Sequence, residues 1–334
     1  MSQVRLQEPE ASQLALPGVP SDSAEWIWTE ETGEEMVESG FVHETVMKAE
    51  VVLALSPRAG VFIDATLGGG GHAEAILDAH PDAQLIGLDR DETALAAAAA
   101  RLARFGDRVR LVKTPFGRIA SALASIGVQT VTGLCADLGV SSPQLDDAGR
   151  GMSFRREGPI DMRMDPSSGE TALELIARLS DDDLADTLYR YGEERRSRRI
   201  ARSVKRALGD NQLVTTLDLR RAIVRAVGPV RVGGVDPATR TFQALRIAVN
   251  EELEELEALL AALPTIIEPN GVAAIMSFHS LEDRLAKRAF QDKGTWAALT
   301  KKPQMATEEE STQNPRSRSA KLRAARRFST EDER

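Results

Sequence analysis

The chain has 334 residues, of which 42% are hydrophobic and 28% charged, and its formal net charge is −9. This length is enough for one large domain or two ordinary ones, and the composition is that of a globular protein. The single cysteine, Cys135, excludes an internal disulfide, and no apolar run is long enough to span a membrane. No export signal is recognisable, so we expect a cytoplasmic protein with no membrane partner.

The acidic residues are concentrated at the N-terminus. The first 50 residues hold 11 acidic and 2 basic side chains, so the net charge belongs to this segment and the remaining 284 residues are neutral overall. Residues 1–38 show little periodicity, and we interpret them as a mostly disordered acidic arm. Because local fields attract polyanions, the total charge does not exclude a nucleic-acid partner.

From residue 41 the sequence alternates between helical and strand patterns. We predict a helix over 44–55, a strand over 61–64 and a helix beginning near Ala73. The elements predicted next are strands at 84–89, 108–113 and 131–137, with an alanine-rich helix at 92–104. Strands separated by helices indicate a mostly parallel sheet in an α/β fold.

The alternation stops after Asp137. Helical patterns fill 171–227, and they are followed by an acidic, leucine-rich helix, a strand at 271–278, a polar loop at 303–315 and a last strand at 322–328. We therefore expect one α/β domain interrupted by a helical insertion. The predicted division is an arm at 1–38, a discontinuous domain at 39–147 and 249–334, and an insertion at 148–248.

Four glycines, at 68–71, separate the first predicted strand from its helix. Such a turn lets a ligand approach the backbone closely and places free N–H groups of the helix start against it. Asp64, Asp89 and Asp137 end three predicted strands, where open parallel sheets bind their ligands. Any one of these acids alone would be taken for a loop residue. Together with the glycine turn they indicate a site for an adenosine-containing ligand, with Asp89 on the ribose hydroxyls.

Both NAD and S-adenosylmethionine contain such a ribose. The glycines also satisfy the G-x-G-x-x-G/A pattern of NAD-binding folds, which is a weak match in isolation. Two features favour S-adenosylmethionine. An acid precedes the glycines, as expected for a cationic methionine group, and no second nucleotide-binding half is visible.

The chain resembles the RsmH (MraW) family of bacterial small-subunit rRNA cytosine-N4 methyltransferases from about residue 43 to 327. The blocks that carry the resemblance are Asp64–His72, Asp137–Asp147, Gly158–Asp165, Tyr191–Arg195, Ala238–Arg246, Ser277–Arg284 and Asn314–Arg323. The resemblance implies a Rossmann-like class I methyltransferase fold. It further implies S-adenosylmethionine as the methyl donor and a cytosine in the decoding region of 16S rRNA as the acceptor, within an assembled or nearly assembled small subunit.

The same resemblance implies a set of cofactor contacts. These are Gly70, Gly71 and His72 on the turn, Asp89 on the ribose, Phe116 beside the adenine, and Asp137 and Gln144 on the loop after the fourth strand. The turn, Asp89 and Asp137 also follow from the residue pattern. Phe116 and Gln144 do not, because taken alone they would be a core and a loop residue.

Methylation of the cytosine amine requires in-line placement and a proton acceptor, because the amine lone pair is delocalised into the ring. The candidate catalytic residues are Ser142, Asp161 and His279, and the sequence does not choose among them. Asp161 could equally pair with Arg163, and His279 could simply close a strand end. Cys135 lies in an apolar strand, so transfer through a cysteine adduct is not expected. The four histidines lack metal-ligand spacing, and no metal site is expected.

Residues 193–208 are predicted to form a helix with Ile200, Val204 and Leu208 on its buried seam. Five arginines fall on the opposite side: Arg195, Arg198, Arg199, Arg202 and Arg206. This stripe is either a solvated face, partly neutralised by acids at 193 and 194, or a track for RNA phosphates. Further arginines at 220–231 and 316–327 favour RNA.

Two other classes of protein stay open at this point. A nicotinamide oxidoreductase would use the same glycine turn, and a non-catalytic RNA-binding or assembly protein would use the same basic helix. The glycine turn and Asp89 disfavour the second class. The sequence leaves open the proton acceptor, the oligomeric state (a homodimer is one option), the role of the arm, and whether free RNA is a substrate.

Overall fold

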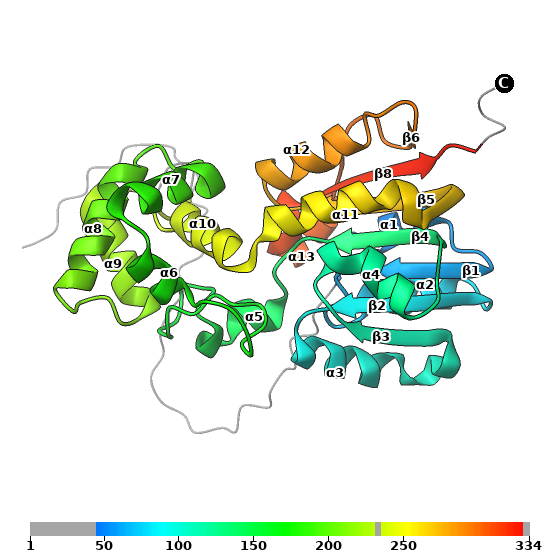
Figure 1. The fold of residues 1–334 in the computed structure, drawn as a ribbon, viewed down its shortest axis with the longest axis horizontal. Helices are drawn as coiled ribbons and strands as arrows, with labels where there is room; N and C mark the ends of the chain where they lie inside the picture. Colours follow the sequence, from blue (N-terminus) through cyan, green and yellow to red (C-terminus); the bar gives the residue numbers. More distant parts are fainter. Residues whose placement is uncertain (1–44, 231–234, 330–334) are drawn as a thin grey trace, which may run out of the picture. The chain divides into compact units, whose positions relative to one another are not determined.

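The computed structural model describes residues 45–230 and 235–329. The acidic arm predicted at 1–38 lies outside these residues. Among the helices of the two described ranges, none combines the length and apolar character that crossing a membrane requires. Figure 1 shows a sheet covered by helices and a further group of helices formed by the middle of the chain.

The sheet has the strand order β3-β2-β1-β4-β5-β8-β6, with β7 paired to β8. The strands are β1 (Gly60–Asp64), β2 (Ala83–Asp89), β3 (Val109–Lys113), β4 (Val131–Asp137), β5 (Ile267–Ser277), β6 (Trp296–Ala298), β7 (Gln304–Met305) and β8 (Lys321–Arg327). The strands β1 to β5 pair in parallel, and β8 runs antiparallel to β5, β6 and β7. The predicted α/β fold with a mostly parallel sheet is confirmed.

Helices cover both faces of this sheet because successive strand side chains point to opposite sides. On one face, Phe62 packs in a cluster with α1 (Lys48–Leu55), α2 (Gly71–Ala79) and α3 (Glu92–Leu102). On the other face, its neighbour Ile63 packs in a cluster with α4 (Ile119–Ser125), α11 (Glu252–Ile266) and α12 (Ser280–Ala289). The near-continuous apolar strands of the sequence reflect this burial on both faces.

The middle of the chain forms a third hydrophobic cluster of its own, with buried residues between Ile160 and Leu245. It is built from α6 (Ala172–Arg178), α7 (Asp181–Gly192), α8 (Ser197–Gly209), α9 (Thr216–Val227) and α10 (Thr239–Asn250). The short helix α5 (Ser142–Asp146) follows β4. The predicted division of the chain at 147 and 249 stays a prediction.

Two sequence-based expectations are wrong. The segment 303–315, predicted as a loop, contains β7 and α13 (Glu308–Gln313). Helix α13 starts at a Thr307 cap, and its Glu310 accepts a hydrogen bond from the backbone N–H of Met47, 263 residues away. The helix predicted at 193–208 begins only at Ser197, because Glu193 adopts a left-handed backbone conformation that ends α7.

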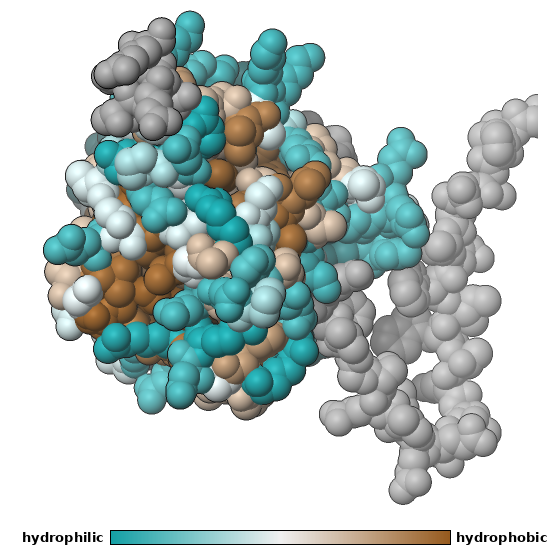
Figure 2. All heavy atoms as spheres, turned by 90° about the vertical axis from the view of Figure 1, so that its right-hand side faces the viewer, coloured by the Kyte–Doolittle hydropathy of each residue, from teal (hydrophilic) through white to brown (hydrophobic). Residues whose placement is uncertain are grey.

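Figure 2 shows the side of the molecule that lies at the right of Figure 1, where the parallel strands begin. Hydrophobic residues are visible there in several places among hydrophilic ones. The candidate site lies at the opposite ends of the same strands.

Candidate active site

The glycine turn joins β1 to α2 and is held by backbone hydrogen bonds. The N–H of Gly70 donates to the carbonyl of Leu67 at 2.8 Å, and the N–H of Leu67 donates to Leu88 on β2 at 2.9 Å. A Cβ on Gly71 would lie 1.7 Å from Oγ1 of Thr45. The close approach of the segment before α1 therefore requires glycine at position 71.

A cavity opens at the carboxyl ends of β1, β2, β4 and β5, the edge where open α/β sheets bind ligands. Six of the seven predicted cofactor residues line it: Gly71, His72, Asp89, Phe116, Asp137 and Gln144. Among the described residues Gly70 is not part of this lining. A Cβ at Gly70 would lie 3.3 Å from that of Ala98, so this glycine packs against α3.

Asp89 ends β2 at the wall of the cavity. Its Oδ2 accepts a hydrogen bond from the N–H of Gly68, and its Oδ1 accepts one from the N–H of Asp91, both at 2.8 Å. Burial raises the pKa of Asp89, although these two N–H donors oppose the shift. Each carboxylate oxygen has a further lone pair. The side chain is thus held in place with acceptor capacity left for two ribose hydroxyls, which fits an adenosine ligand.

Asp64 ends β1, yet it is 1% exposed and does not line the cavity in the described part of the chain. Its Oδ1 accepts a hydrogen bond from Thr66, while its Oδ2 has no hydrogen-bond partner among the described residues. Burial raises the pKa of Asp64 to about 6, although nearby His72 lowers it. The expectation that all three strand-end acids face the ligand is therefore not met by Asp64.

Gln144 caps α5 and ties the loop after β4 to the start of α3. Its Oε1 accepts from the N–H of Ser141, and its Nε2 donates to Oδ2 of Asp91, both at 3.2 Å. The same Asp91 oxygen lies 2.9 Å from the guanidinium of Arg150. This network gives Gln144 a structural role at the cavity wall, and its contact with the cofactor stays a prediction.

The three catalytic candidates lie in different surroundings. Ser142 begins α5, and its side chain is outside what the structure describes. Asp161 accepts two hydrogen bonds from the side chain of Arg163, at 2.8 and 2.7 Å, and one from its backbone N–H at 3.0 Å. Burial raises the pKa of the Asp161 carboxyl, but these hydrogen bonds together with the charges of Arg163 and Arg150 lower it overall. Asp161 is not part of the cavity lining in the described ranges. It is therefore a poor proton acceptor.

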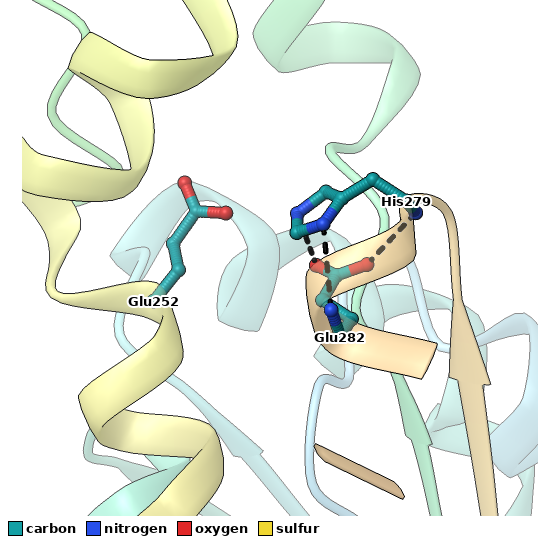
Figure 3. A group of neighbouring side chains, drawn as sticks. All are labelled: Glu252, His279 and Glu282. Atoms are coloured by element: carbon teal, nitrogen blue, oxygen red, sulfur yellow. Dashed lines mark hydrogen bonds and ion pairs between the residues drawn. The ribbon is translucent and has the colours of Figure 1, made fainter. Parts of the chain in front are cut away.

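His279 is the N-cap of α12, and its ring lies over the carboxylate of Glu282 (Figure 3). The N–H of Glu282 donates to Nδ1, and Nε2 lies 3.1 Å from Oε1 of Glu282, without the geometry of a hydrogen bond. Oε2 of Glu282 accepts from the N–H groups of Phe278 and His279. Glu282 is 2% exposed and lines the cavity.

Glu252, at the start of α11, also lines the cavity, and Figure 3 shows its side chain next to this pair. Ligand atoms of Glu252, His279 and Glu282 lie within 4.8 Å of one another, a grouping that the sequence does not predict. Both oxygens of Glu252 already accept hydrogen bonds from Arg246, at 2.7 and 2.8 Å. The position of Glu282 three residues after His279 is the capping-box spacing, which is the one signal that could have located it.

The arginine stripe differs from its prediction in one member. Arg198, Arg199, Arg202 and Arg206 lie on α8 and are exposed, opposite a seam formed by Ile200 and Val204. Leu208, predicted on the seam, is only partly buried. Arg195 is exposed but lies in the connection before α8, because that helix begins later than predicted.

Cys135 lies within β4 and is 2% exposed. Burial raises the pKa of its thiol well above the ordinary value. A buried, protonated thiol is not a nucleophile, so the structure agrees with the expectation that no cysteine adduct forms.

In the sheet, the antiparallel strand β8 lies between β5 and β6, and the cavity lies beside the glycine turn. This strand order and this cavity define an S-adenosylmethionine-dependent methyltransferase of the Rossmann-like class. The sequence profile of the MraW methylase family matches residues 40–328, and the chain belongs to this family.

Similar curated proteins carry the name ribosomal RNA small subunit methyltransferase H. The protein from Sorangium cellulosum is 66% identical, and the alignment covers 86% of this chain and 91% of that protein. The protein from Prochlorococcus marinus is 53% identical over 87% of this chain and 94% of its own length. Fibrillarin from Aeropyrum pernix, solved with bound S-adenosyl-L-methionine, is 8% identical with a TM-score of 0.39, covering 83% of this chain and 74% of that one. This structural similarity is too low to inform the site.

Proposed function

We propose that this protein transfers a methyl group from S-adenosylmethionine to the N4 amine of a cytosine in the decoding region of 16S rRNA. The names of the curated relatives support small-subunit rRNA as the substrate. The resemblance of the sequence motifs supports the N4 amine and the decoding region.

One observation carries the chemistry of this proposal. Asp137 and Glu282 line the same cavity as the glycine turn. Asp137 ends β4, and Glu282 lies in the helix that follows the neighbouring parallel strand β5. The cofactor supplies an electrophilic methyl group on a sulfonium centre. The chain supplies oxygen acceptors beside it, which an amine needs to lose its proton, and the described lining includes no thiol for attack on the ring carbon.

We propose Glu282, which lines this cavity, and His279, which contacts it, as the acceptor pair for the N–H proton, although His279 itself is not among the described residues of the lining. The two backbone N–H groups fix the Glu282 carboxylate, and the imidazole of His279 contacts its other oxygen. A preorganised acceptor positions the amine for attack, and positioning of this kind contributes several kcal/mol to lowering a barrier. Ser142 stays a second candidate, because it begins the helix beside the cavity-lining Ser141 and Gln144.

We further propose that residues 148–248 hold the RNA around the target base. A cytosine must leave its stack, or come from a single-stranded region, to reach a buried methyl donor. The exposed arginines of α8 offer a track for the flanking phosphates.

The test is to incubate the protein with labelled S-adenosylmethionine and undermethylated small subunits and to identify the modified nucleoside. The proposal expects label in N4-methylcytidine from the decoding region. Label in a different nucleoside would overturn the base assignment. RNA binding without any label transfer would indicate a non-catalytic assembly protein, and protection against heat by NADH but not by S-adenosylhomocysteine would indicate an oxidoreductase.

A further inference from the structure

A groove of about 900 Å³ opens outside the cofactor cavity. Its walls come from five separate segments: the end of α7, the connection to α8, the residues after α9, the start of α10, and the first turn of α12. The arginine stripe of α8 does not form these walls. Arg195 lies in the connection before α8, not on that helix, and it is part of the groove walls.

The groove is positively charged. Five arginines line it (Arg190, Arg195, Arg196, Arg240 and Arg284) together with three acids (Glu193, Glu194 and Asp236). The acids have partners: Glu193 accepts from Ser280 and Arg284, Glu194 accepts from the N–H of Arg196, and Asp236 pairs with Arg220.

Three of these arginines form no ion pair with a carboxylate in the described part of the chain, although Arg240 lies near enough to Glu193 to help lower the pKa of that carboxyl. Arg195 is exposed and has no hydrogen-bond or ion-pair partner there. Arg196 donates to the carbonyl of Val227 at 2.8 Å, and Arg240 donates to the carbonyl of Glu193 at 3.2 Å. Carbonyl contacts orient a guanidinium and leave its charge available, which favours an anionic occupant.

Apolar side chains stand among these charges. Tyr189 is 62% exposed, Val230 is 75% exposed and Val235 is 48% exposed, and all three line the groove. An exposed aromatic ring between arginines is typical of surfaces that bind single-stranded nucleic acid, because bases stack on the ring while guanidinium groups contact the phosphates.

The groove and the cofactor cavity both have residues of α12 in their walls, and they share no lining residue in the described part of the chain. Leu281 lines the groove, and the next residue, Glu282, lines the cavity. The carboxylate of Glu193 binds Ser280 at 2.7 Å and Arg284 at 3.2 Å, which fastens the wall of the groove to this turn. A nucleotide chain that occupies the groove would pass this part of α12 to place a base in the cavity.

We propose that this groove binds the single-stranded nucleotides that flank the target base. Tyr189 stacks on one base, and Arg195, Arg196 and Arg240 contact the phosphates. This inference rests on the proposed function, because it assumes an RNA substrate whose reacting base lies in the cavity.

The experiment compares Tyr189→Ala and the double variant Arg195→Ala/Arg240→Ala with two matched controls outside the groove. Leu53→Ala removes an apolar side chain that is 75% exposed on α1, and Arg110→Ala removes an exposed arginine of β3. Methyl transfer to undermethylated small subunits gives KM and kcat, and calorimetry gives the affinity for S-adenosylmethionine. Fluorescence anisotropy gives the affinity for a single-stranded oligonucleotide of the decoding region.

We expect each groove variant to raise KM and weaken oligonucleotide binding by about tenfold, the scale of one lost stacking or phosphate interaction. The controls and the cofactor affinity should stay within about twofold of the wild type. The double variant should also show a weaker salt dependence of RNA binding.

Oligonucleotide binding equal to that of the controls would overturn the proposal. If the groove variants bind subunits more weakly but bind the oligonucleotide normally, the groove would instead bind a ribosomal protein. That result would also overturn the proposal. If the wild type transfers no methyl group to subunits, the proposed function fails. The anisotropy comparison then still decides whether the groove binds single-stranded RNA.

Discussion

Replacement of Asp64 with asparagine tests the energetic cost of the buried carboxyl at the end of β1. Burial raises the pKa of this group from 3.8 to about 6. The folded state therefore binds the proton more tightly than the unfolded state does. The stabilisation that follows is complete below pH 3.8 and is lost as the pH rises to about 6. A shift of this size corresponds to about 3 kcal/mol.

Asparagine keeps the acceptor oxygen for the N–H of Thr66 and does not ionise. We expect the free energy of unfolding of Asp64→Asn, relative to the wild type, to rise between pH 4 and 6 and to level off above, by up to about 3 kcal/mol. Urea unfolding followed by circular dichroism across this pH range measures the difference. Parallel stability curves for the two proteins would refute the reasoning.

Asp161→Asn is the matched control with the opposite sign. Burial favours the neutral form of Asp161, but the hydrogen bonds from Arg163 and the charges of Arg163 and Arg150 together lower its pKa. Its ionised form therefore stabilises the fold above the ordinary pKa, and this contribution is lost as the pH falls through the lowered value. The variant should be less stable than the wild type at neutral pH, with the gap closing in acid.

Three further substitutions test the site and the RNA surface. Asp89→Ala should abolish S-adenosylmethionine binding in calorimetry, because it removes the ribose acceptor, and near-normal affinity would contradict the site assignment. Substitution of both Arg198 and Arg202 with glutamate reverses their charge, and it should weaken RNA binding about tenfold or more and leave cofactor affinity intact. Unchanged RNA binding would indicate that these arginines of α8 form only a solvated face. Glu282→Gln and His279→Gln should each lower kcat about 100-fold, the scale of general base catalysis, with little change in cofactor affinity.

Local pattern was enough to predict the parallel strands and the ends of β4, whose predicted and observed bounds agree at 131–137. Its residues before Asp137 are all buried, so the strand appears in the sequence as a mostly apolar run, interrupted by Thr132. The glycine turn was also predictable, because it comes shortly after the first strand in the sequence. Asp89 was predictable because it is the last residue of the second strand. The strands β6 and β7 were not predicted, since three and two residues are too few to show a period.

The other features of the fold and of the site depend on contacts between residues that are far apart in the sequence. The position of β8 between β5 and β6 depends on pairing between segments about 50 residues apart, which no local period reports. Three features each join residues from different elements: the grouping of Glu252 with Glu282, the contact of Gly70 with α3, and the groove lined by arginines. A side chain's type and its neighbours in the chain indicate which chemistry it can perform. Its partners are set by how the helices pack on the sheet, and that packing exists only in the folded molecule.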